Sequence, residues 1–167
     1  MTPSSPTGAE KEVLIYTDGA CRGTPGPGGW AALLICEHTE KMISGFEVHT
    51  TNNRMEMLAA VEGLRALTKP SSVQLFTDSR YLKDGITLWL PKWLANNWKT
   101  VNKAPVKNQD LWCDLSDLSG QHQVQWCWVK AHAGHPYNER VDAQARQEIV
   151  LHTVKNTVCN QKRGAAL

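Results

Sequence analysis

Two stretches of the sequence each end in a Thr-Asp pair that is well placed for chemistry. Residues 13–17 are apolar or β-branched and lead into Asp18, and residues 73–77 lead in the same way into Asp78. Runs of this kind are typical of strands, and the segment between them contains a helical pattern. If the strands are parallel neighbours, both carboxylates lie at the carboxyl edge of one sheet, where open α/β sheets bind ligands.

Two further acids, Glu56 and Asp142, lie in segments that are expected to form helices. Glu56 follows a helix-start signal at residues 50–53, and Asp142 follows a helix start at Asn138. Each of the four acids also has a structural alternative. The alternatives are a turn at Gly19 for Asp18, a capping box with Asn53 for Glu56, a helix cap beside Ser79 for Asp78, and an ion pair with Arg146 for Asp142.

The four carboxylates would need a counter-charge if they shared one edge. Two carboxylates 4 Å apart repel by about 4 kcal/mol at an effective dielectric constant near 20, so a cluster requires protonation or cations. Oxygen ligands without Cys or His favour Mg²⁺ or Mn²⁺ over Zn²⁺. Four negative charges balance two divalent ions, which can clamp the attacking and leaving oxygens of an in-line phosphoryl displacement.

Two histidines, His132 and His135, lie in a short loop that also contains a glycine. A zinc pair is an alternative that the sequence disfavours, because no cysteines stand at zinc spacing. Histidine ordinarily titrates near working pH, which makes His132 a candidate proton carrier. For His135, a role in stabilising the loop is the simpler interpretation.

Length and composition are those of one globular domain. The chain has 167 residues, 41% of them apolar and 20% charged, and its net charge of +2 neither favours nor excludes nucleic acid. We expect a disordered tail at residues 1–10, one folded domain at 11–152 and a polar tail at 153–167. No apolar run is long enough to span a membrane, and five cysteines without a C-x-x-C pair indicate a reducing, cytoplasmic setting.

Turn and helix signals divide this domain into strands and helices. The expected strands cover residues 12–18, 30–36, 41–48, 73–78 and 123–130, and the first three form an antiparallel meander. The expected helices cover residues 50–69, a segment from Ser79 that Gly85 interrupts, residues 108–118, and a last segment from Asn138.

The motifs, taken together, resemble type 1 ribonuclease H in its bacterial form. They occur in the order of that family and cover about residues 11 to 150. The matching motifs are Tyr-Thr-Asp18-Gly-Ala, Pro25-Gly-Pro-Gly-Gly29, Thr51-Asn-Asn-Arg-Met-Glu56, Thr77-Asp78-Ser79, Pro105-Val-Lys-Asn108-x-Asp110-Leu-Trp112, and Trp128-Val-Lys-x-His132-Ala-Gly-His-Pro-x-Asn138-Glu-Arg-x-Asp142.

The resemblance implies a ribonuclease H-like α/β fold, a five-stranded mixed sheet flanked by helices on both faces. It implies a monomeric endoribonuclease that hydrolyses the RNA strand of RNA–DNA hybrids by a two-metal-ion mechanism, leaving 3′-hydroxyl and 5′-phosphate ends. The implied cofactor is Mg²⁺, two ions per active site, with Mn²⁺ as a substitute. The implied metal ligands are Asp18, Glu56, Asp78 and Asp142; His132 would shuttle a proton or help release product, and Glu139 would tune metal exchange.

The resemblance also implies a binding surface for the hybrid. RNA alone offers a 2′-hydroxyl, which a shallow-groove binder can detect without reading the sequence. Thr51 and Asn108 match positions that bind a DNA phosphate in relatives, and Asn52 and Asn53 suit minor-groove contacts unless they cap the helix. The full set of expected substrate contacts is Gly19, Ala20, Cys21, Thr51, Asn52, Asn53, Arg80, Trp93, Lys99 and Asn108.

Residues 89–107, which combine tryptophans with lysines, match the basic protrusion that holds the DNA strand in this family. The alternative is a packed helical hairpin whose tryptophans are core. We expect both: Trp89 and Trp112 pack, whereas Trp93 faces phosphates together with a set of lysines. These lysines are Lys92, Lys99, Lys103 and Lys107.

The chain departs from the family pattern at a few positions. Residues 94–97 are uncharged where relatives often carry a basic cluster, which affects the expected affinity for hybrid and not the chemistry. Ala131 and Tyr137 replace a usual glycine and a common glutamate. A non-catalytic hybrid-binding module would be indicated by a lost carboxylate, and a transposase-like core by an additional DNA-binding domain. All four acids are present, so we expect an active enzyme.

Overall fold

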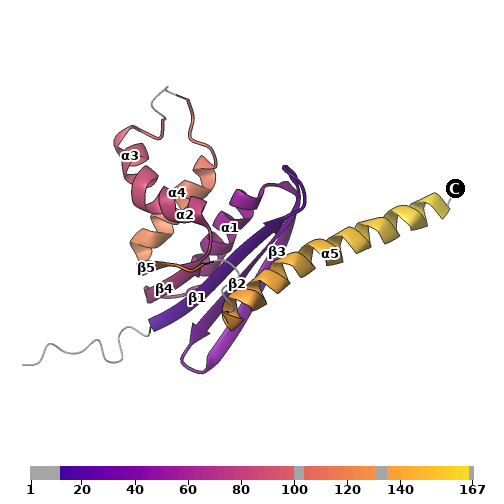
Figure 1. The fold of residues 1–167 in the computed structure, drawn as a ribbon, viewed down its shortest axis with the longest axis horizontal. Coiled ribbons are helices and arrows are strands. Elements are labelled where there is room, and N and C mark those ends of the chain that lie inside the picture. The colour runs from indigo at the N-terminus through magenta and orange to yellow at the C-terminus, as the bar shows by residue number, and fades with distance from the viewer. Residues whose placement is uncertain (1–11, 100–103, 131–134, 166–167) are drawn as a thin grey trace, which may run out of the picture.

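The computed structural model describes residues 12–99, 104–130 and 135–165, with side chains up to residue 153 (Figure 1). Five strands form one sheet in the order β3-β2-β1-β4-β5. The strands are β1 (Glu12–Cys21), β2 (Gly26–Cys36), β3 (Thr39–Thr50), β4 (Ser72–Thr77) and β5 (Gln123–Trp128). The helices are α1 (Asn52–Arg65), α2 (Arg80–Asp84), the π-helix η1 (Gly85–Trp89), α3 (Leu90–Ala95), α4 (Gln109–Gln121) and α5 (Pro136–Ala165).

The pairing of the strands confirms the expected topology. β1, β2 and β3 form the antiparallel meander, and β4 lies parallel to β1 with Tyr16 opposite Phe76. β5 lies parallel to β4 on its other side, so β4 separates β1 from β5. Asp18 and Asp78 therefore end up at the same edge of the sheet, as the two Thr-Asp runs predict.

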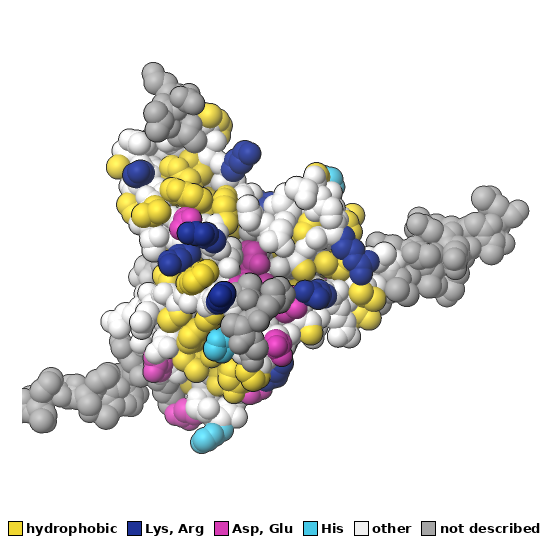
Figure 2. Space-filling view, viewed as in Figure 1, with side chains coloured by type: hydrophobic (Ala, Val, Ile, Leu, Met, Phe, Trp, Pro, Cys, Tyr) yellow, Lys and Arg dark blue, Asp and Glu magenta, His cyan; other side chains and the backbone are white. Residues whose placement is uncertain are grey.

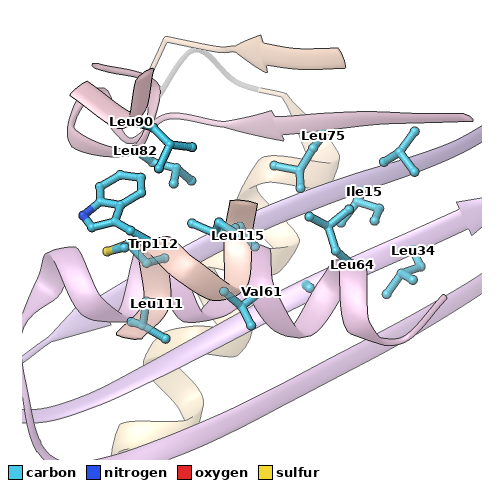
Figure 3. Close-up of a cluster of buried hydrophobic side chains, with 14 of the residues drawn as sticks. Ile15, Leu34, Val61, Leu64, Leu75, Leu82, Leu90, Leu111, Trp112 and Leu115 are labelled. Atoms are coloured by element: carbon cyan, nitrogen blue, oxygen red, sulfur yellow. The ribbon is translucent and has the colours of Figure 1, made fainter. Parts of the chain in front are cut away.

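Helices cover both faces of the sheet, which confirms the expected fold class. Helices α1 and α4 bury one face in a cluster that includes Ile15, Leu64 and Leu75, all fully buried, together with Trp112 (Figure 3). Helix α5 contacts β1, β2 and β3 on the opposite face, where Val141 and Ala145 are fully buried. Burying about 100 Å² of apolar surface contributes roughly 2.5 kcal/mol, so these two layers are the main source of stability.

The Gly/Pro stretch after Asp18 is expected to be a loop, but the strands on either side of it extend into this stretch. β1 continues to Cys21 and β2 already begins at Gly26, so the two strands pair across this stretch, with Cys21 opposite Gly28. A methyl group at Gly28 would lie 2.5 Å from the Thr50 side chain. The glycines thus allow strands to continue where their composition indicates a turn.

One helix is interrupted where the sequence predicts, and another is longer than expected. The segment from Ser79 is helical but changes to a π-helix at Gly85, where an added Cβ would lie 1.9 Å from the Trp112 ring. The interruption is therefore caused by a close approach of two elements. Helix α5 begins at Pro136 and continues to Ala165, so most of the polar tail expected at residues 153–167 has a helical backbone that extends beyond the sheet (Figure 1).

Among the described residues, no helix combines the length and the apolar character that crossing a membrane would require.

Candidate active site

Three carboxylates converge at the carboxyl edge of the sheet. Asp18, Glu56 and Asp78 each offer an oxygen atom, and these three atoms lie within 4.8 Å of one another. β1 supplies Asp18, helix α1 supplies Glu56, and Asp78 directly follows β4. Gly19 allows α1 to come this close, because a side chain there would meet the backbone nitrogen of Glu56 at 2.4 Å.

Burial and mutual repulsion act strongly on these acids. The pKa of Asp18 is raised from 3.8 to about 7, first by burial and then by the charge of Asp78. Burial, followed by the charges of Asp18 and Asp78, raises the pKa of Glu56 well above its ordinary value. One carboxylate oxygen of Glu56 is buried without a hydrogen-bond partner. A cluster of hard oxygen donors with an unsatisfied buried atom fits a divalent cation of the Mg²⁺ class.

Asp142 reaches the cluster from the other face of the sheet. It lies on α5, and a side-chain hydrogen bond with Asp142 contributes to the raised pKa of Asp18. Its carboxylate also forms an ion pair of 3.2 Å with Arg146, one helical turn further on. Asp142 therefore forms the ion pair with Arg146 that was its structural alternative, and it also lies beside the acid cluster.

The caps of two helices rule out the structural alternatives for Glu56 and Asp78. Thr51 caps α1 by accepting a hydrogen bond from the N–H of Arg54 at 3.2 Å, so no capping box joins Asn53 to Glu56. Ser79 caps α2 in the same way, accepting from the N–H of Leu82 at 3.1 Å. For Asp18 the turn interpretation holds in part, because its side chain accepts a hydrogen bond of 2.9 Å from the N–H of Gly19.

The structure describes only part of the loop that contains His132 and His135. His132 lies outside the described residues, so its predicted role as proton carrier stays a prediction. His135 and Glu139 are exposed at the start of α5, where the N–H of Glu139 donates to the carbonyl of His135 at 3.0 Å. Glu139 thus lies in the first turn of α5, three residues before Asp142, and His135 directly precedes the helix.

The residues expected to contact the minor groove flank the acids. Asn52 and Asn53 are exposed in the first turn of α1, and neither supplies the helix cap, so both amides are available to a ligand. Gly19 is buried, and Ala20 and Cys21 are partly exposed on the last residues of β1. The Cys21 thiol is turned toward backbone carbonyls of the hairpin and of β3, which leaves mainly the backbone of this segment for contacts.

Asn108 is held in a network that the sequence did not predict. Its side-chain oxygen accepts a hydrogen bond of 3.1 Å from Arg54, and its amide donates to the hydroxyl of Tyr81 at 3.1 Å. Arg54 also binds Asp110 through two hydrogen bonds of 3.0 and 2.9 Å. In the sequence, the one sign of this network is that Arg54 and Asp110 lie within the family motifs. The network joins α1 to the start of α4 and fixes the orientation of the Asn108 amide.

Trp93, which is expected to face phosphates, is partly buried in an aromatic cluster, and its contact with phosphates stays a prediction. Its ring packs against Trp89, Trp98 and Trp112 at centroid distances of 5.9, 6.5 and 5.5 Å, so the aromatic side chains around α3 pack against α4. Trp93 also lines a groove of about 540 Å³. Three of the predicted lysines line the same groove, Lys92, Lys99 and Lys107, whereas Lys103 lies outside the described residues.

Comparisons with known proteins agree with this arrangement. The family model described as RNase H matches residues 10–150. The chain is 53% identical over 148 residues to the "Ribonuclease H" of Rhodopseudomonas palustris (strain BisB5), covering 89% of this chain and 99% of the relative. It is 31% identical to the crystal structure of LC9-RNase H1, a type 1 RNase H with the type 2 active-site motif. That match has a TM-score of 0.76 and covers 84% of this chain and 72% of the other.

A more distant structure supports the fold alone. LC11-RNase H1, solved in complex with an RNA/DNA hybrid, is 18% identical and has a TM-score of 0.64, covering 84% of this chain and 99% of the other. The order of the strands, the convergence of the acids and the match over most of both chains lead to one assignment. The chain belongs to the RNase H family.

Proposed function

We propose that this protein is an endoribonuclease that hydrolyses the RNA strand of RNA–DNA hybrids. The observation that carries the proposal is the convergence of Asp18, Glu56 and Asp78 within 4.8 Å, in a chain of the RNase H family. A buried group of carboxylates is costly unless it serves a cation, and in this family the cation serves phosphodiester hydrolysis.

The acids are proposed to hold two Mg²⁺ ions, with Mn²⁺ as a substitute. When bound, such ions neutralise charge on the phosphate and favour in-line displacement by water. Asp18, Glu56 and Asp78 would hold one ion, and Asp142, which contacts Asp18, would complete the site for the second. This displacement leaves a 3′-hydroxyl and a 5′-phosphate, and His132 carries a proton between the site and solvent.

The other residues orient the hybrid over the acids. The exposed amides of Asn52 and Asn53 and the backbone at Gly19–Cys21 contact 2′-hydroxyls and base edges in the minor groove. Asn108, oriented by Arg54, binds a phosphate of the DNA strand together with Thr51. Lys92, Lys99 and Lys107 extend this contact along the groove beside Trp93. None of these contacts reads a base sequence, so cleavage is proposed to be largely sequence-independent.

We further propose that the protein acts as a monomer in the cytoplasm. The cysteines whose side chains the structure describes are free thiols: Cys21, Cys36, Cys113 and Cys127. Free thiols at this frequency are typical of a reducing compartment.

A gel assay on one labelled RNA strand tests the function directly. The strand is paired with DNA, paired with RNA or left single, and each form is incubated with Mg²⁺, Mn²⁺ or EDTA. Cleavage restricted to the hybrid and to the metal-containing lanes is the expected result. Absence of cleavage in every lane, with the hybrid still shifted on a native gel, would contradict an enzyme and favour a binding module.

A further inference from the structure

Trp128 stands apart from the aromatic cluster around Trp93. It is the last residue of β5, and 47% of it is exposed. The ammonium group of Lys83, on α2, lies 5.1 Å from the centre of the indole ring. A large, half-exposed aromatic side chain with a cation placed against it is typical of binding surfaces, because burial alone does not account for an indole at such a position.

The pair lies next to the acid cluster. Trp128 is opposite Thr77 in the parallel pairing of β4 with β5, and the N–H of Val129 donates to the carbonyl of Thr77 at 2.9 Å. Asp78 follows Thr77 directly. Neighbouring strands are roughly 5 Å apart, so the backbone of Trp128 lies about one strand spacing from Thr77, the residue before Asp78.

A second cation lies near the pair. Arg80 is exposed and precedes Lys83 by three residues, so the two cations are neighbours on the surface of α2. Figure 2 shows, on the face in view, Lys and Arg side chains beside Asp and Glu side chains near the centre. A positive surface that borders a cluster of acids is suited to a polyanion whose reacting phosphate lies over the acids.

We propose that Lys83 and Trp128 form a binding site for the RNA strand, one or two nucleotides from the phosphate that is cleaved. Lys83 contacts a phosphate, and the free side of the Trp128 ring packs against the sugar or base of the same nucleotide. The strand that crosses the acids must continue over an adjacent surface, and β5 provides one. The groove beside Trp93 lies on the α3 side and serves the other strand. The inference rests on the proposed function and deepens it.

Binding through an indole and an ammonium group has no preference for a base. Every base and sugar offers a flat or apolar surface to an aromatic ring, and every nucleotide carries the phosphate. The site therefore adds affinity along the RNA strand without adding sequence specificity, in agreement with a nuclease that acts on any hybrid.

The test measures hybrid binding by fluorescence anisotropy in the inactive Asp18→Asn background, with Ca²⁺-free buffer at several salt concentrations. Trp128→Ala is expected to raise the Kd about 5-fold to 50-fold, and Trp128→Phe is expected to restore most of the affinity. Lys83→Ala is expected to reduce the slope of log Kd against log salt by about one. Lys69→Ala and Leu151→Ala, two exposed positions away from this surface, serve as matched controls.

Hybrids that carry one uncharged methylphosphonate linkage show whether Lys83 contacts the RNA strand or the DNA strand. The penalty of Lys83→Ala should disappear when the neutral linkage stands at one position of the RNA strand near the cleavage site. If it disappears only for linkages in the DNA strand, or if both variants bind like the controls, the inference is overturned while the proposed function stands. If the wild-type protein cleaves no hybrid in the gel assay, the proposed function fails first.

Discussion

Asp18 is buried among like charges and therefore destabilises the metal-free protein at neutral pH. Its pKa of about 7 means that folding holds a proton on a group that would ionise near 3.8 in the unfolded chain. We expect Asp18→Asn to abolish cleavage, to leave hybrid binding nearly unchanged, and to raise the metal-free stability at pH 8 by roughly 1–4 kcal/mol. Cleavage assays, anisotropy and urea unfolding measure the three effects.

Asp117→Asn is the matched control for this variant. Asp117 is an exposed acid on α4, so the same change there should leave cleavage and stability within experimental error. An Asp18→Asn protein that cleaved at the wild-type rate would refute the assignment of the acid cluster as the active site.

The raised pKa values also predict how stability depends on pH and metal. A carboxyl group with a raised pKa in the folded state contributes no penalty below its unfolded pKa and the full penalty above its folded pKa. In EDTA, the contribution of Asp18 should therefore make the protein lose stability as the pH rises from about 4 to about 7, and Glu56, whose pKa is also raised, should add a loss in the same direction. Saturating Mg²⁺ at pH 8 should recover this loss.

Thermal unfolding at pH 5 and pH 8, with and without Mg²⁺, tests this dependence. Other acids, such as Asp110, have a pKa lowered by Arg54 and act in the opposite direction at more acidic pH. The informative quantity is thus the difference between wild type and Asp18→Asn. A difference that stayed constant across this range would show that the acids do not titrate as a buried cluster.

At the scale of elements, helix α5 must be placed accurately because it carries Asp142. Tyr137, five residues before Asp142, packs against Tyr16, and Tyr16 stacks on Phe76 at 4.5 Å. Three residues after Asp142, the backbone of α5 comes so close to β2 that a side chain at Gly29 would lie 2.1 Å from the carbonyl oxygen of Ala145. Asp142 is thus held between two points at which α5 is docked on the sheet.

Gly29→Ala should consequently displace Asp142 along with α5. We expect a loss of stability of about 1–3 kcal/mol, at least a tenfold lower kcat, and weaker Mn²⁺ binding by calorimetry, with KM for the hybrid little changed. Gly120→Ala on α4, where a methyl group meets nothing within 4 Å, is the control. Normal Mn²⁺ binding by a folded Gly29→Ala protein would show that the close approach does not position Asp142.

The sequence predicted the strands and the edge of the acids because both follow from local patterns. The repeated Thr-Asp runs and the helix starts predict the elements that carry Asp18, Glu56 and Asp78, and the assumption that the two strands are parallel neighbours brings the acids to one edge. The interruption at Gly85 was predicted from the glycine itself, but the close approach of the Trp112 ring could not be predicted, because Trp112 is far along the chain. The position of Trp93 and the network of Arg54 with Asp110 depend in the same way on contacts between distant segments.

At the scale of the whole molecule, the acids that are proposed to serve hydrolysis lie apart from the groove that is proposed to bind the DNA strand. The acids lie at the edge of the sheet, whereas Lys92, Lys99 and Lys107 line a groove built by η1, α3 and the segment before α4. The net charge of +2 does not reveal this separation, because it does not say where the three lysines of the groove and the carboxylates of the cluster lie. Removing charge from the groove should therefore change binding without touching the reaction.

Replacing both Lys92 and Lys99 with Ala should raise KM about 5-fold to 30-fold at low salt and leave kcat within a factor of two. Each lysine that neutralises a phosphate contributes about 0.9 to the slope of log affinity against log salt, so the double variant should lose nearly two units of slope. Steady-state kinetics between 50 and 200 mM salt measure both quantities, with the exposed Lys41→Ala on β3 as control. A fall in kcat at unchanged KM would instead place these lysines in the chemical step, since an interaction made only in the transition state is lost from kcat.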